Sequence, residues 1–61
     1  MPVDGMHIDC EAGDQLEAEC RGQYVTVGVA EAGGAGWQHA ALTPQQAREL
    51  AKSLDELAAR V

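Results

Sequence analysis

The chain has no phenylalanine, one tryptophan and one tyrosine among its 61 residues, so few large side chains can fill a hydrophobic core. Many of the other apolar residues are alanine or valine, each of which buries little area. A chain of this length buries only about 60% of its unfolded surface and is marginally stable alone. Small domains therefore depend on staples or on self-association. We expect a single domain over residues 1–61 that forms a homodimer.

Long apolar runs are absent too, since none approaches the roughly 20 residues that a membrane-spanning helix needs. The chain does not open with the charged, apolar and small-residue regions of a signal peptide. We therefore expect a cytoplasmic protein with no membrane partner. Cysteine is scarce, and in a reducing cytosol Cys10 and Cys20 would be buried thiols.

Basic residues number only four against ten acidic ones, which gives a formal net charge of −6. The excess lies in residues 1–40, where Arg21 is the sole lysine or arginine, whereas residues 41–61 are balanced. Such a field disfavours direct binding to nucleic acid or to an anionic membrane. It suits a protein partner with a basic surface.

Three segments alternate apolar and polar residues with a period of two, the pattern of half-buried strands. They predict strands at about 5–12, 16–21 and 24–30. Residues 31–36 form a glycine-rich linker, after which 37–41 is either a short fourth strand or an extended lead-in. If it pairs with the third strand, Trp37 and His39 face outward.

The hairpin between the second and third strands is the best determined. A two-residue loop, Gly22-Gln23, places glycine where a type II′ turn requires it. The register that follows opposes only apolar residues on the inner face. These pairs are Cys20 with Val25, Ala18 with Val27, and Leu16 with Val29.

The sequence does not determine the length of the turn between the first two strands, because any odd number of loop residues keeps the apolar side chains on one face. A three-residue loop at 13–15 would pair Cys10 with Ala18. A five-residue loop at 13–17 would place Cys10 opposite Cys20, the register that a disulfide needs. The common three-residue hairpin has its left-handed residue last, whereas Gly13 comes first.

The sharpest local signal is the start of a helix at Thr43. Its hydroxyl suits the N-cap, Pro44 suits the first helical position, and Gln46 is spaced to close a capping box. Apolar residues then recur with the spacing of one buried stripe, which predicts a helix over 44–60 that covers the sheet. The stripe comprises Ala47, Leu50, Ala51, Leu54, Leu57, Ala58 and Val61. The predicted fold is α+β: an antiparallel three-stranded meander, with a possible fourth strand, packed on one C-terminal helix.

The segment Leu-Thr-Pro-Gln-Gln-Ala-Arg-Glu-Leu-Ala, residues 42–51, resembles the final helix of many short, uncharacterised proteins of high-GC bacteria and their phages. In those proteins a few strands precede a Leu-Thr-Pro-x-Gln-Ala helix start. The resemblance covers about a sixth of the chain. It implies a compact strand–strand–strand–helix domain, and it implies no activity and no site residues.

Candidate metal ligands are few and poorly spaced. They are His7, Asp9, Cys10, Cys20 and His39, and no Cys-x-x-Cys or His-x-x-x-His pair occurs among them. The predicted strands turn both cysteines inward and both histidines outward. We therefore expect no cofactor, and a small metal or redox module using Cys10, Cys20 and a histidine is the alternative hypothesis.

No nucleophile and base are brought together by the predicted strand faces, so we expect no enzyme. The leading hypothesis is a protein–protein interaction domain, a small acidic adaptor or inhibitor, with a phage-type inhibitor of a basic host surface as one form of it. Its binding surface would be the outer face of the sheet, where carboxylates lie beside the two aromatic residues. The alternative for Trp37 is that its ring folds back over the open end of the core. The expected partner-binding residues are Asp9, Glu11, Glu17, Glu19, Tyr24, Trp37 and His39.

Overall fold

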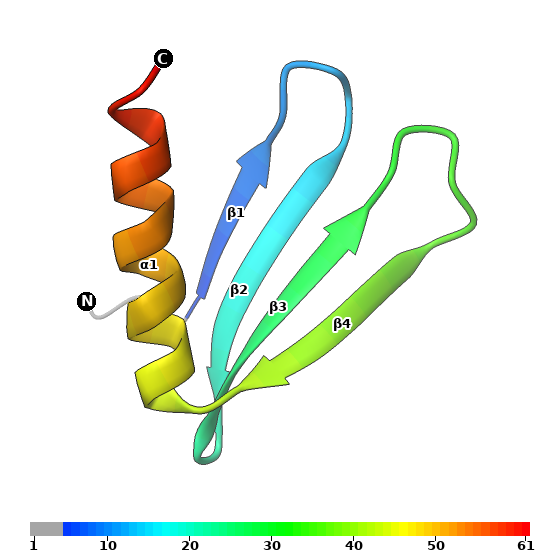
Figure 1. Ribbon diagram of the computed structural model, residues 1–61. Coiled ribbons are helices and arrows are strands. Elements are labelled where there is room, and N and C mark those ends of the chain that lie inside the picture. Colours follow the sequence, from blue (N-terminus) through cyan, green and yellow to red (C-terminus); the bar gives the residue numbers. More distant parts are fainter. Residues whose placement is uncertain (1–4) are drawn as a thin grey trace.

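The structure, a computed structural model, describes residues 5–61 as one antiparallel sheet followed by one helix (Figure 1). The strands lie in chain order, β1-β2-β3-β4, so the sheet is a meander of hairpins. The elements are β1 (Gly5–Asp9), β2 (Gln15–Arg21), β3 (Tyr24–Ala30), β4 (Trp37–Leu42) and α1 (Pro44–Ala58). The predicted α+β class is confirmed, and the fourth strand is present.

The β2–β3 hairpin has the predicted register. Arg21 pairs with Tyr24, and the three inner apolar pairs follow along the two strands. Gly22 has a φ of 62°, and no described residue other than glycine has a positive φ, so Gln23 does not. A positive φ at the first central residue alone is the signature of a type II′ turn.

The β1–β2 connection differs from both predicted loops. β1 ends at Asp9 rather than at residue 12, and Ile8 pairs with Leu16 across a five-residue loop, 10–14. The loop closes on itself, because the Cys10 amide donates to the Asp14 carbonyl at 2.8 Å. Cys10 is therefore in a turn and not opposite Cys20, which rules out the register that a disulfide needs. The loop has an odd number of residues, as predicted, and Ile8 and Leu16 therefore share the inner face.

β4 pairs with β3 along its whole length and turns Trp37 and His39 to the outer face, as predicted for a fourth strand. The β1–β2 and β3–β4 loops lie at the same end of the sheet, away from the start of α1, and they are tied together (Figure 1). Asp14 Oδ1 accepts a hydrogen bond from the Ala32 amide at 2.8 Å, so the β1–β2 loop supports the β3–β4 loop.

The helix begins as predicted. The Gln46 amide donates to Thr43 Oγ1 at 3.2 Å, and the Thr43 amide donates to Gln46 Oε1 at 3.0 Å, which completes the capping box. The helix ends at Ala58, two residues before the predicted end. It is not long and apolar enough to cross a membrane, and no other helix occurs in the described part of the chain.

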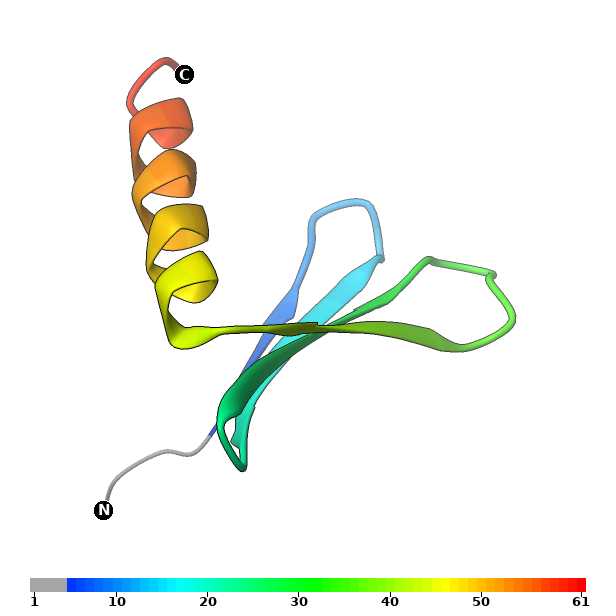
Figure 2. The ribbon, with the colours of Figure 1, turned by 60° about the horizontal axis from the view of Figure 1, so that its bottom comes forward.

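The helix covers less of the sheet than its stripe predicts. It contacts β3 and β4 near the corner at Leu42, but it makes no comparable contact with β1 or β2. Turned by 60°, the molecule shows α1 rising away from the sheet from that corner (Figure 2). Among residues 5–61 no hydrophobic side chain is buried, and the one buried residue is Gly28. The fold therefore has two layers that meet at one end and stand open at the other.

Candidate functional site

The outer face of the sheet, opposite α1, carries the candidate site. Pairing in the three hairpins brings together on this face His7 with Glu17, Glu17 with Gly28, and Gly28 with His39. One row of residues therefore crosses all four strands. Polar side chains from β1, β2 and β4 line this row, because most apolar residues of the alternating pattern face inward, with Ala30 and Ala41 as exceptions on the outer face.

Because Gly28 has no side chain, the side chains of His39 and Glu17 can approach each other over the backbone of β3. A Cβ on Gly28 would lie 2.8 Å from Cδ2 and 2.9 Å from Nε2 of His39, and 3.2 Å from Cγ of Glu17. The imidazole thus lies across the bare backbone of β3. From there His39 Nε2 is 3.2 Å from Glu17 Oε1, so a residue of β4 reaches a residue of β2 across the strand between them.

Trp37 completes the arrangement. Its ring stacks with that of His39, with centroids 6.1 Å apart and planes 23° apart, and it meets His7 edge-on at 6.3 Å. His7 Nε2 is in turn 3.0 Å from Asp9 Oδ1. The indole remains 37% exposed. We call His7, Asp9, Glu17, Trp37 and His39 the outer-face cluster.

The other candidate residues lie apart from this cluster. Tyr24 pairs with Arg21 at the opposite end of β3 from the Ala30–Trp37 pair, so the two aromatic residues do not form one patch. Glu19 Oε1 accepts a hydrogen bond from Arg21 Nη2 at 2.6 Å, which partly neutralises that end of the face. The expected surface is thus divided into a Trp37 end and a Tyr24 end.

Glu11 is not on the sheet at all. The prediction placed it on the outer face of a first strand running to residue 12, but it lies in the exposed 10–14 loop. The alternating residues after Asp9 are turn residues, because Gly13 takes a φ of 95° and its amide donates to the Cys10 carbonyl.

Two members of the site were missed from the sequence. His7 was assigned to the outer face but not to the binding residues, because its contact with Trp37 spans two intervening strands. Gly28 falls on the outer face of the predicted third strand, where the alternating pattern alone gives it no role. A glycine inside a strand often marks a close approach of another group, and that signal would have pointed to it.

The alternative metal or redox site does not assemble. Cys10 lies in the β1–β2 loop, whereas Cys20 pairs with Val25 near the other end of the sheet, and both thiols are free. The prediction that both are buried is wrong, because Cys10 is half-buried in a turn and Cys20 is exposed on an uncovered part of the inner face. No group of three or more histidine, cysteine, aspartate or glutamate side chains in residues 5–61 is arranged to hold a metal ion.

Comparison of the chain with protein-family models, with curated proteins and with solved structures gives no match in any of the three. The assignment of function therefore depends on the site itself.

Proposed function

We propose that the chain is a protein–protein interaction domain that acts without catalysis, as a small acidic adaptor or inhibitor in the cytoplasm, and that it binds its partner through the outer-face cluster. The observation that carries this proposal is the exposed Trp37 ring, held between His39 and His7 on a regular sheet. Aromatic side chains of this kind are enriched among the residues that dominate binding energies at protein interfaces.

The cluster is suited to binding because its side chains are already positioned. A partner that meets a flexible side chain must immobilise it, at about 0.5–1.5 kcal/mol each. Here Trp37 is stacked on His39, and His39 is held over Gly28 by its contact with Glu17. Much of that ordering is complete before a partner arrives.

Charge favours a partner with a basic surface. Asp9 and Glu17 lie within the cluster, Glu19 lies farther along the same face, and the net charge of the chain is −6. Such a field speeds the approach of a basic surface and discourages acidic ones. Each member of the cluster is exposed or half-buried, a setting typical of surface recognition rather than of acid–base catalysis in a water-excluded site.

The proposal predicts that the position of the acidic groups matters, and not only their number. We expect Glu17→Gln/Glu19→Gln to weaken binding of a short oligo-arginine peptide about three- to tenfold, since each exposed ion pair is worth up to about 1 kcal/mol. The matched control Glu49→Gln/Glu56→Gln removes the same charge from α1 and should have little effect. Because Trp37 is the only tryptophan, its emission reports binding at the cluster directly.

Equal weakening by both charge-matched variants would show that only net charge matters. Binding without a change in Trp37 emission would place the peptide elsewhere on the molecule. Either result would contradict the proposed site.

A further inference from the structure

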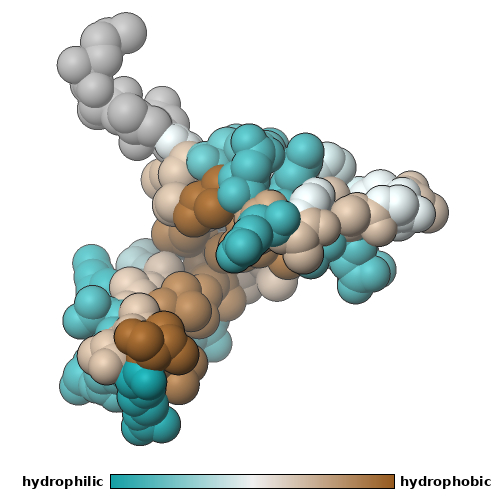
Figure 3. Space-filling model, turned by 90° about the horizontal axis from the view of Figure 1, so that it is seen from above, coloured by the Kyte–Doolittle hydropathy of each residue, from teal (hydrophilic) through white to brown (hydrophobic). Residues whose placement is uncertain are grey.

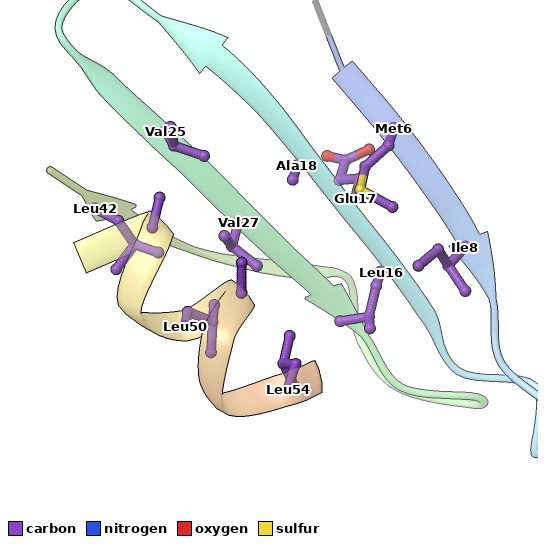
Figure 4. A pocket seen from close by; sticks show the side chains of 12 residues that line it. Met6, Ile8, Leu16, Glu17, Ala18, Val25, Val27, Leu42, Leu50 and Leu54 are labelled. Atoms are coloured by element: carbon purple, nitrogen blue, oxygen red, sulfur yellow. The ribbon is translucent and has the colours of Figure 1, made fainter. Parts of the chain in front are cut away.

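The inner face of the sheet carries a second feature, an apolar groove between α1 and the open part of the sheet. Its volume is about 230 Å³. Met6, Ile8 and Leu16 line it on the sheet side, and Leu50 and Leu54 project into it from α1 (Figure 4). In the space-filling view from above, apolar surface follows the side of the helix nearest the sheet and continues into the angle between the two layers (Figure 3).

The side chains of this face are too exposed for a finished core. Met6 is 55% exposed on the sheet, and Leu54 is 56% exposed on the helix. The helix stripe also continues past the groove to Leu57, which is 54% exposed, and the exposed Val61 follows beyond the end of the helix. The two halves of a hydrophobic core are both present, but neither is covered by the other.

The size of the uncovered surface can be compared with what a folded monomer exposes. A compact protein of 6.4 kDa exposes roughly 3,800 Å², whereas this chain exposes 5204 Å². Its Cα radius of gyration is 12.6 Å, against roughly 10.5 Å for a compact chain of this length. The excess, about 1,400 Å², is more than the roughly 800 Å² that each partner buries in a standard interface.

We propose that a second copy of this chain covers the groove, with the apolar stripe of each helix lying on the open β1–β2 face of the other copy. The chain offers both a ridge, at Leu54 and Leu57, and a groove floor, at Met6 and Ile8. A surface that contains both halves of a contact is self-complementary, and it closes as a two-fold dimer when each copy gives its ridge to the groove of the other. This inference concerns the face opposite the outer-face cluster and stands independently of the proposed function.

The distribution of charge also supports a second copy of the chain as the partner and the inner face as the interface. Among residues 5–61, the one charged residue that borders the groove is Glu17, and its carboxylate is on the outer face with His39. The described lining therefore offers a basic partner no counter-charge inside the groove. Joining two copies through their inner faces keeps their acidic outer faces apart. Joining them through the outer faces would oppose like charges, which is unfavourable. The dimer expected from the composition is therefore assigned to the inner face.

Sedimentation equilibrium of the unmodified chain tests the proposal first. The expected mass is twice the 6.4 kDa of one chain, falling toward one chain on dilution. Leu54→Glu and Ile8→Lys should each lower the association constant at least tenfold, because each places a charge in the groove. The control Ser53→Glu changes the neighbouring helix position, which is off the stripe, and should remain dimeric.

Mixing the two damaged chains distinguishes contact between copies from contact within one copy. In the mixture, the carboxylate introduced by Leu54→Glu in one chain meets the ammonium group introduced by Ile8→Lys in the other. The second groove of the pair is then lined by the unchanged Leu54 and Ile8. We expect the mixture to recover a dimer that neither variant forms alone.

Several outcomes would overturn the proposal. A wild-type chain that is monomeric at several hundred micromolar would exclude the dimer. This holds whether or not the groove of that monomer binds an apolar dye. Larger, open-ended assemblies would exclude a closed two-fold pair, and a mixture that stays monomeric would exclude the helix-on-sheet arrangement.

Discussion

In a chain whose His39 is already alanine, Gly28→Ala is expected to raise the free energy of unfolding by about 0.5–1 kcal/mol, because glycine weakens the interior of a strand. In the wild-type chain the same substitution is expected to lower the free energy of unfolding by about 1 kcal/mol, as overpacking does. The opposite signs follow from one contact. The new Cβ would lie 2.8 Å from the His39 ring, and the ring would have to leave its place over β3.

Displacing His39 has further consequences in the outer-face cluster. The ring would lose its contact with Glu17 and its stacking on Trp37, so the Trp37 emission should change in Gly28→Ala and not in a control such as Val29→Ala on the inner face. Urea unfolding of the wild type, the two single variants and the double variant, at one protein concentration, gives the coupling energy. We expect a coupling of about 2 kcal/mol, the difference between the two effects of Gly28→Ala. Additive effects would show that His39 does not depend on a bare backbone at Gly28.

The second large effect is a dependence of stability on protein concentration. If folding and dimer formation are linked, a hundredfold increase in concentration stabilises the folded state by about 2.7 kcal/mol of dimer. With the urea sensitivities of small proteins, about 1–3 kcal/mol per molar, the unfolding midpoint should rise by on the order of 1 M. The reason is that Leu54 and Leu57, which are exposed in the described part of the chain, are covered by the second copy in the proposed dimer.

Two variants serve as controls for this dependence. Leu54→Glu should unfold at a lower urea concentration, and its midpoint should not move with protein concentration. Ser53→Glu should behave as the wild type. A wild-type midpoint that is the same over the hundredfold range would mean that one chain reaches its full stability alone.

Sequence patterns predicted the β2–β3 hairpin and the helix start because each is specified by neighbouring residues. Gly22 alone accepts the positive φ of its turn, and Thr43 and Gln46 satisfy each other's amides. The β1–β2 turn lacks such a local determinant. Parity fixes which side of the sheet Ile8 faces but permits several loop lengths, and the hydrogen bond from Ala32 to Asp14 that supports the actual loop comes from far along the chain.

The sequence predicts which face of the sheet carries the candidate site, but it does not predict which residues make up the cluster. Alternation placed Trp37 and His39 outward, and pairing along β4 confirms this. Their association with His7 depends on how far the indole reaches across β3 and β2, which no spacing in the sequence encodes. The prediction placed Glu11 on the sheet because it extended the first strand to residue 12, whereas β1 ends at Asp9.

The helix stripe illustrates a further limit. Its spacing predicts that Leu50, Leu54 and Leu57 pack against another surface, but it does not say which surface that is. The prediction assigned them to the chain's own sheet. In the structure the start of the stripe meets β3 and β4, and the rest is left uncovered.

The central claim is that the outer face is kept free for a partner while a second copy completes the inner face. Isotope-filtered NOE spectra of a mixed sample, in which half of the chains are ¹³C-labelled, test it most directly. We expect contacts between different chains that join Leu54 and Leu57 to Met6 and Ile8, and none that involve Trp37. Contacts between chains at Trp37 and His39, or a complete absence of contacts between chains, would contradict it.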